Sequence, residues 1–163
     1  MHIYVDADAC PVKEIIIEEA GIFGVSVTLV SSIAHFSTKA HPEHVRVVYV
    51  DTGAEAADYK LLSFVRSGDI LITQDYGLAS LALPKGTRVL NQKGYAYTTE
   101  NIDALLQQRY FSALQRNSGQ RTKGPKPFTS KDKDTFRLLF QRILHALPRP
   151  EMPSEFEKEP PSI

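Results

Sequence analysis

Short apolar runs that alternate with amphipathic segments constrain the fold of this chain more than any other feature. Apolar and β-branched runs predict five strands, at residues 2–6, 25–30, 46–50, 69–73 and 87–90. Helical patterns cover residues 11–22, 52–66, a stretch after 77, 100–116 and 129–147. This alternation favours parallel strands joined by right-handed crossovers. We therefore expect an α/β fold with three layers, α/β/α, a mostly parallel five-stranded sheet and two C-terminal helices.

Local signals predict several helix boundaries and one buried helix face. Pro11 is expected at the first helical position, where its missing N–H costs nothing. Thr52 and Glu55 have the spacing of a capping box for the second helix, and Thr129 is expected to cap the last one. In the helix at 100–116, the side chains expected to face inward are Ile102, Leu105, Leu106, Tyr110 and Leu114.

A length of 163 residues fits one domain, which we place at residues 1–147. Residues 148–163 are rich in Pro and Glu and are expected to be disordered. No run of about 18 apolar residues predicts a membrane-spanning helix, and the first residues enter a strand without a signal-peptide pattern. The single cysteine, Cys10, fits a reducing compartment. Together these features predict a cytoplasmic protein with no membrane partner.

The net charge of zero hides a strong asymmetry along the chain. Residues 1–108 hold 8 Lys and Arg against 13 Asp and Glu, a net charge of −5. Residues 109–149 hold 10 Lys and Arg against 2 Asp, a net charge of +8, and residues 150–163 have a net charge of −3. An acidic front and a basic back allow a cation to bind at one place and a polyanion at another.

Four acidic side chains are expected to converge on one edge of the predicted sheet. Asp6 and Asp8 follow the first strand, Asp58 lies near the start of the second helix, and Asp75 follows the fourth strand. Ligands of open α/β sheets bind at the carboxyl ends of the strands, and like charges held together favour a cation between them. We therefore predict a site for Mg²⁺ or Mn²⁺ at Asp6, Asp8, Asp58 and Asp75.

Three of the four acids also have a structural interpretation. Asp8 and Asp75 have the positions of helix caps or turn formers, and Asp58 fits pairing with a neighbouring Lys or a backbone amide. We expect Cys10 to be a small packing residue and not a reactive thiol. We expect a solvated loop, and not a zinc site, at His35, His41 and His44.

Three segments carry a resemblance to a known family. They are Val-Asp-Ala-Asp-Ala-Cys-Pro-Val-Lys at 5–13, Ala-Ala-Asp at 56–58 and Gly-Asp-Ile-Leu-Ile-Thr-Gln-Asp-Tyr at 68–76. Further positions agree: Asn91, Asn101, Ile102, Arg109, Lys126 and Phe128. Over residues 1–146 the chain resembles the YaiI/YqxD family of uncharacterised bacterial proteins.

That family is similar in fold to PIN-like nucleases, and the resemblance implies a chemistry. PIN domains use an acid after the first strand, an acid in the helix before the fourth, and an acid in a Thr-x-Asp turn after the fourth. Asp6, Asp58 and Asp75 occupy the matching positions, whereas Asp8 is an addition to the pattern. The resemblance implies that these acids act as catalytic residues, holding Mg²⁺ or Mn²⁺ and activating water on a phosphodiester of RNA.

Two other functions fit the same sequence. Asp-x-Asp after a first strand is also the nucleophile motif of haloacid-dehalogenase-like phosphatases, in which Asp6 attacks phosphorus, Asp8 moves the proton and Ser31 binds phosphate. The other alternative is an RNA-binding domain without catalysis. For an RNA ligand, single-stranded in our expectation, the basic segment suggests contacts at Arg116, Arg121, Lys123 and Lys126, with Asn91 and Arg109 added from the family resemblance.

Overall fold

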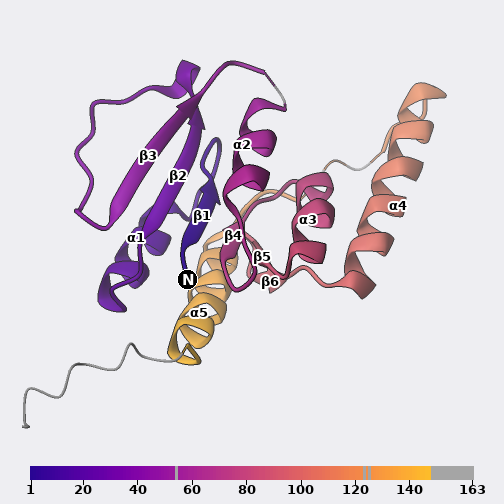
Figure 1. The fold of residues 1–163 in the computed structure, drawn as a ribbon. Helices are drawn as coiled ribbons and strands as arrows, with labels where there is room; N and C mark the ends of the chain where they lie inside the picture. The colour runs from indigo at the N-terminus through magenta and orange to yellow at the C-terminus, as the bar shows by residue number, and fades with distance from the viewer. Residues whose placement is uncertain (54, 123, 125, 148–163) are drawn as a thin grey trace, which may run out of the picture.

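A six-stranded sheet forms the centre of the computed structural model, which describes residues 1–53, 55–122, 124 and 126–147 (Figure 1). The strands are β1 Ile3–Asp6, β2 Val27–Ser32, β3 Val45–Val50, β4 Ile70–Ile72, β5 Arg88–Asn91 and β6 Tyr95–Ala96. Their spatial order is β3-β2-β1-β4-β5-β6, and every neighbouring pair is parallel except β5 and β6. The mostly parallel α/β sheet is therefore confirmed, with one strand more than the five predicted.

The additional strand, β6, returns antiparallel to β5 through a tight turn. It pairs Ala96 with Leu90 and Tyr95 with Asn91, and at two residues it is too short to give a strand pattern in the sequence. Gly94 in the turn has φ 93°, and a Cβ there would lie 2.6 Å from the backbone nitrogen of Phe136. The turn therefore fits beneath the last helix only with glycine at this position.

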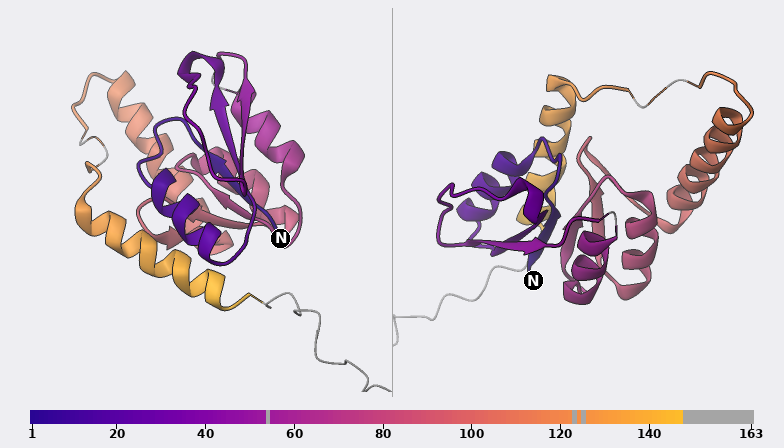
Figure 2. Two further views of the ribbon diagram at one scale, coloured as in Figure 1. Left: turned by 90° about the vertical axis from the view of Figure 1, so that its left-hand side faces the viewer. Right: turned by 90° about the horizontal axis from the view of Figure 1, so that it is seen from above.

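Helices cover both faces of the sheet and complete the three predicted layers (Figure 2). The helices are α1 Lys13–Ile22, α2 Ala56–Phe64, α3 Tyr76–Ala82, α4 Thr99–Asn117 and α5 Ser130–His145, with short 3₁₀ turns η1 Ile33–His35 and η2 Leu83–Lys85. Helices α1 and α5 cover one face, and α2 and α3 with the first part of α4 cover the other. Alternate strand residues divide between the two cores, as a parallel sheet buried on both sides requires.

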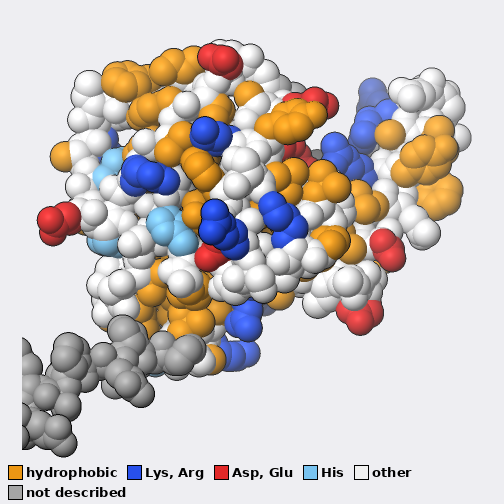
Figure 3. Space-filling model, viewed as in Figure 1, with side chains coloured by type: hydrophobic (Ala, Val, Ile, Leu, Met, Phe, Trp, Pro, Cys, Tyr) orange, Lys and Arg blue, Asp and Glu red, His pale blue; other side chains and the backbone are white. Residues whose placement is uncertain are grey.

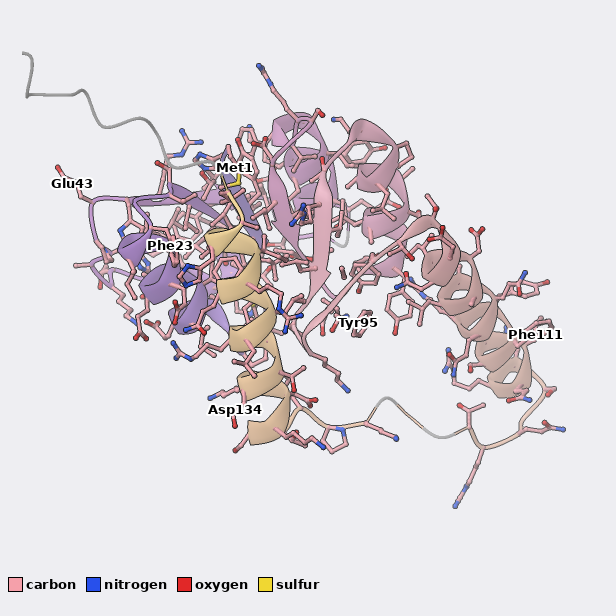
Figure 4. The ribbon with its side chains drawn as sticks, turned by 90° about the horizontal axis from the view of Figure 1, so that it is seen from below. Met1, Phe23, Glu43, Tyr95, Phe111 and Asp134 are labelled. Atoms are coloured by element: carbon pink, nitrogen blue, oxygen red, sulfur yellow. The ribbon has the colours of Figure 1, made fainter. Side chains whose placement is uncertain are left out.

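Helix α5 closes one face of the sheet against α1 (Figure 4). Phe136 and Phe140 are fully buried, and their rings stack at 5.5 Å. Arg137 donates a 2.6 Å charged hydrogen bond to Glu19 of α1, and Gln141 donates a second of 2.9 Å, so the buried Glu19 carboxylate is compensated. Thr129 and Asp132 form the capping box that starts α5, which confirms Thr129 as its cap.

Two helix starts differ from the sequence prediction. Helix α1 begins at Lys13 with Val12 as its N-cap, so Pro11 lies in the preceding turn and not at the first helical position. Helix α2 begins at Ala56, and its N-cap Glu55 makes no capping hydrogen bond through its side chain. The capping box predicted for Thr52 and Glu55 is therefore wrong, because the chain enters the helix several residues later than Thr52.

Helix α4 leaves part of its predicted inward face exposed. Ile102 is buried and Leu105 and Leu106 are partly buried, but Tyr110 and Leu114 are 62% and 46% exposed. Phe111 lies on the outer side of α4 (Figure 4). The second half of α4 extends past the sheet (Figure 1). The apolar spacing correctly predicts a helix here, but this part of its apolar face is exposed.

Across the described ranges, no helix is long and apolar enough to cross a membrane. The predicted disordered tail, 148–163, lies outside the residues that the structure describes.

Candidate active site

The sheet reverses its strand order at β1, and the candidate site lies at the carboxyl end of this strand. From β1 the chain builds outward through β2 and β3, then returns to place β4 on the other side of β1. Open α/β sheets bind ligands at such a reversal. Asp6 is the last residue of β1, and Thr73 and Asp75 follow β4 directly.

Thr73 ties these two strand ends together. Its side chain is buried, and its hydroxyl donates a 3.0 Å hydrogen bond to Oδ2 of Asp6. The same hydroxyl accepts a 3.0 Å hydrogen bond from the backbone N–H of Asp75. One buried threonine therefore fixes the orientation of the Asp6 carboxyl and the start of the turn that carries Asp75.

The Asp6 carboxyl lies in an environment that disfavours its charge. Burial raises the pKa of Asp6 to about 6, although the hydrogen bond from Thr73 acts in the opposite direction. The neighbouring carboxylates of Asp58, Asp75 and Asp8 raise this pKa further. A cation at this edge would relieve both the desolvation and the repulsion.

Asp75 and Asp58 come from the helices beside β4. Asp75 is the N-cap of α3, and its Oδ1 accepts a 3.1 Å hydrogen bond from the backbone N–H of Leu78. Asp58 lies in the first turn of α2 and is partly buried. Burial, followed by the charges of Asp75 and Glu55, raises the pKa of Asp58. The structure therefore brings Asp6, Asp58 and Asp75 to one edge. There the charge of Asp75 raises the pKa of the other two carboxyl groups.

An open cleft of about 320 Å³ lies over the ends of β1 and β4. Its lining residues are Asp6, Gln74, Asp75, Tyr76 and Arg109. Arg109 comes from α4, and its Nη1 lies 3.9 Å from Oδ1 of Asp75. Basic side chains lie on the side of α4 that faces the rest of the molecule (Figure 3), and α4 itself contributes two arginines, Arg109 and Arg116. The cleft therefore combines carboxylates on its floor with a guanidinium at its rim.

Asp58 faces a second pocket that shares Asp75 with the first. Within the described ranges, no three His, Cys, Asp or Glu side chains come close enough together to hold a metal ion. The acids are thus neighbours without forming a closed set of three ligands.

Asp8 does not join the other three acids. Its Oδ1 accepts a 2.7 Å hydrogen bond from the Ser31 hydroxyl, and its carboxylate accepts from the backbone N–H of Ser32 at 3.0 Å. Nδ1 of His35 lies 3.1 Å from the same carboxylate. Ala9 has a left-handed φ of 53°, which turns the chain between β1 and α1. The structure therefore directs Asp8 toward the end of β2, where it anchors the loop that follows.

Replacing Asp8 by Asn is expected to lower the free energy of unfolding by about 1–2 kcal/mol, because the amide loses charged hydrogen bonds from Ser31 and the Ser32 backbone. Chemical denaturation measures the change. Ser31→Ala is the companion variant and should lose a smaller amount. A wild-type stability for Asp8→Asn would show that the anchor contributes nothing.

The predicted substrate residues are distributed unevenly. Arg109 lines the cleft, whereas Ser31 is bound to Asp8 on the α1 side of the sheet. Asn91 is buried; its amide donates to the Tyr97 hydroxyl at 2.7 Å, and that hydroxyl donates to the Thr73 carbonyl at 3.2 Å. Asn91 therefore supports the turn after β4 and does not line the cleft. Arg116, Arg121 and Lys126 are exposed, and Lys123 lies outside the described residues.

Cys10 is a buried packing residue, as expected, whereas the solvated-loop interpretation is wrong for His44, which is partly buried. Burial raises the pKa of Cys10 to about 11, which disfavours the reactive thiolate. His44 shares a 2.8 Å hydrogen bond with the Ile17 carbonyl, and His35 is paired with Asp8.

Comparison with known proteins places the chain in a family. The family described as "Uncharacterized BCR, YaiI/YqxD family" matches residues 4–146. UPF0178 proteins of Oceanobacillus iheyensis and Bacillus cereus are 60% and 59% identical over 144 residues, which are 88% of this chain and 99% of each relative. The chain belongs to the YaiI/YqxD family.

Among solved structures, this YaiI/YqxD member is similar to the crystal structure of Rae1 (YacP) from Bacillus subtilis. The TM-score is 0.42 and the identity 16%, over 90% of this chain and 99% of that one. A similarity this distant assigns no activity to the YaiI/YqxD chain.

The sequence does not single out Thr73, Gln74 or Tyr97 as site residues. Thr73 belongs to the Thr-x-Asp turn and was signalled by that motif, although its buried hydrogen bond to Asp6 is visible only in three dimensions. Gln74 lines the cleft and bonds Gln92 at 2.9 Å. Tyr97 supports the turn from a position directly after β6, a strand that has no sequence signal. The YaiI/YqxD site thus depends on residues whose roles arise from contacts across the sheet.

Proposed function

We propose that this protein is a divalent-metal-dependent hydrolase of phosphodiester bonds in single-stranded RNA. The observation that carries the proposal is the pairing of Asp6 with Asp75 at the strand reversal, with Arg109 beside them at the rim of the cleft. Carboxylates suit a cation, a guanidinium suits a phosphate, and both line one cleft.

The side chains of the cleft fit Mg²⁺ or Mn²⁺ by their chemistry. Both ions prefer oxygen ligands, and Mg²⁺ keeps several waters while one or two carboxylates hold it. Asp6 and Asp75 would hold the ion, with Asp58 near enough to add charge. When bound, such an ion lowers the pKa of its water and neutralises charge on a phosphate.

The other residues of the cleft have separate tasks in this proposal. Thr73 holds the Asp6 carboxyl in place through its 3.0 Å hydrogen bond. The backbone N–H of Leu78 holds Asp75 at the start of α3. Arg109 is half exposed and free to contact a phosphate oxygen with bidentate hydrogen bonds. Thr73 and the first turn of α3 thereby keep the two carboxylates fixed, while the guanidinium orients the substrate.

A polyanion is the ligand class that best fits the charge distribution. Arg116, Arg121 and Lys126 are exposed on or after α4, the helix that supplies Arg109 to the cleft. Arg137, in contrast, is already paired with Glu18 and Glu19 and is not counted among the RNA contacts. The basic surface thus continues from the cleft along α4.

The phosphatase alternative finds no support in the site geometry. It needs Asp8 beside Asp6 to move a proton, but Asp8 accepts its hydrogen bonds from Ser31 and Ser32. Ser31, the candidate phosphate-binding hydroxyl of that alternative, is itself occupied by Asp8.

Incubation with two substrates tests the proposal. Single-stranded RNA and an aryl phosphate are each offered with Mg²⁺, with Mn²⁺ and with EDTA. We expect metal-dependent cleavage of the RNA and no release of phosphate from the aryl ester. The opposite pattern would support a phosphatase, and RNA binding without turnover would support a non-catalytic RNA-binding domain.

The salt dependence of RNA affinity tests the basic surface. Each phosphate contact on a single strand contributes about −0.7 to the slope of log affinity against log salt. Changing Arg121, Lys123 and Lys126 together to Ala is expected to flatten that slope by roughly two. The matched control removes Arg46, Arg66 and Arg88, three exposed arginines near the amino ends of β3, β4 and β5, and should keep the wild-type slope. Equal slopes for both triple variants would exclude Arg121, Lys123 and Lys126 as phosphate contacts.

A further inference from the structure

A second pocket, of about 420 Å³, opens between α2 and α3 directly beside the cleft. The two cavities share one side chain, Asp75. The apolar lining of the second pocket includes Tyr59, Leu62, Leu78 and Leu81. Tyr59 is 71% exposed and Leu81 is 60% exposed, so large apolar surfaces stand at the pocket without a partner from the described chain. Pockets of this volume with mostly apolar walls bind small organic groups.

The charged side chains of this pocket are all carboxylates, those of Glu55, Asp58 and Asp75, and no Lys, Arg or His is among the described lining residues. Its other polar side chains are the hydroxyls of Tyr59 and Ser80. A phosphate is therefore repelled. A flat, neutral group with N–H donors on its edge is favoured, because its faces meet Tyr59 and Leu81 while its edge meets a carboxylate.

We propose that this pocket holds one nucleobase of the RNA, next to the phosphodiester in the cleft. The inference rests on the proposed function and adds a base-specific contact to it. Asp75 borders both cavities, so a phosphate over the first places the attached nucleoside at the mouth of the second. Tyr59 supplies the stacking surface, as aromatic side chains do in proteins that bind single-stranded RNA.

The carboxylates determine which base fits best. An ionised carboxylate only accepts hydrogen bonds. Guanine presents two adjacent donors, its N1–H and its N2 amino group, and these match the two oxygens of one carboxylate. Uracil presents a single N–H between two carbonyls, which the carboxylates repel. Glu55, exposed at the N-cap of α2, is the carboxylate we assign to this contact.

Binding of three labelled pentanucleotides to the full-length protein tests the assignment. They differ only in their central position: guanosine, uridine or an abasic ribose. The measurement uses Ca²⁺ in place of Mg²⁺. We expect guanosine to bind roughly ten-fold more tightly than the abasic probe, as stacking of one base predicts. Uridine is expected to fall between them.

Variants separate the stacking contact from the carboxylate contact. Tyr59→Ala is expected to remove most of the ten-fold difference, and Tyr59→Phe, which keeps the ring, is expected to retain it. Glu55→Gln is expected to reduce the preference for guanosine over uridine and to leave the abasic probe unaffected. Leu138→Ala and Glu43→Gln are the matched controls, since both residues are exposed and neither lines the pocket.

The outcomes distinguish the pocket from the proposed function. RNA that binds or is cleaved equally well with all three central positions overturns the base pocket and leaves the proposed function intact. A protein that binds none of the probes overturns both. Binding that depends on Tyr59 but is displaced by a small organic cation, such as agmatine, and is insensitive to base identity assigns the pocket to a cation instead.

Discussion

Replacing Asp75 by Asn is expected to lower the proposed metal-dependent RNA hydrolysis by at least about 100-fold, because the residue we propose as a metal ligand loses its charge. The substitution is expected to remove the carboxylate charge and to leave the local fold intact. Asn is as good a helix N-cap as Asp, so the hydrogen bond from the Leu78 N–H survives and α3 keeps its start. Asp6→Asn is expected to act similarly, since an amide oxygen still accepts the hydrogen bond from Thr73. Rate measurements on both variants, with calorimetric titration of Mn²⁺, provide the test.

Asp132→Asn is the matched control for these two variants. Asp132 is also a carboxylate at the start of a helix, but it belongs to the capping box of α5 and does not line the cleft. It is expected to hydrolyse RNA and bind Mn²⁺ like the wild type. If the double variant Asp6→Asn with Asp75→Asn binds Mn²⁺ as tightly as the wild type, these acids are not the metal ligands.

The same Asp6→Asn variant is expected to be more stable than the wild type when no metal is present. The pKa of Asp6 is about 6 in the folded protein and 3.8 for the ordinary group. Between these values the folded state binds the proton more tightly, so the free energy of unfolding falls as the pH rises from about 4 to about 6. A difference of one unit between the folded and unfolded pKa corresponds to about 1.4 kcal/mol. The variant avoids this loss and should gain about 1–3 kcal/mol at pH 7.

Thermal unfolding in EDTA over a pH series checks this sign. The advantage of Asp6→Asn should be largest at pH 7 and should disappear below pH 4, where the wild-type carboxyl is protonated in both states. Mn²⁺ should then stabilise the wild type and not the variant. A variant that is less stable at every pH would mean that the Asp6 carboxylate serves the fold and not a ligand.

The order and type of the main elements could be predicted from the sequence because each has a local cause. The strands at β1, β2 and β4 are apolar runs buried on both sides, and Asp6 and Asp75 follow such runs directly. Their position at one edge follows once the strands are parallel, because the carboxyl ends of parallel strands lie at the same edge of a sheet. Thr129 starts α5 because its capping box is complete within four residues.

Other features depend on contacts between distant segments. Asp6 and Asp8 both follow the first apolar run, two residues apart, but Asp8 lies beside the left-handed turn at Ala9 and its carboxylate bonds Ser31 at the end of β2. Asn91 resembles a site residue in sequence, yet β6 brings Tyr97 over it and buries it. The apolar stripe of α4 is genuine, but its spacing carries no information on whether a core faces it.

The covering of one sheet face by α5 has a consequence for synthesis of the chain. Ile3, Val5 and Ile16 belong to the same core as Phe136 and Phe140. The core that begins with β1 and α1 is therefore completed only when α5 has been synthesised. The bond from Arg137 to Glu19 spans 118 residues of sequence. Until residue 144 has left the ribosome, α1 alone covers this apolar face. Premature termination between α4 and α5 would therefore leave one face of the sheet only partly covered, a species prone to aggregation and to proteolysis.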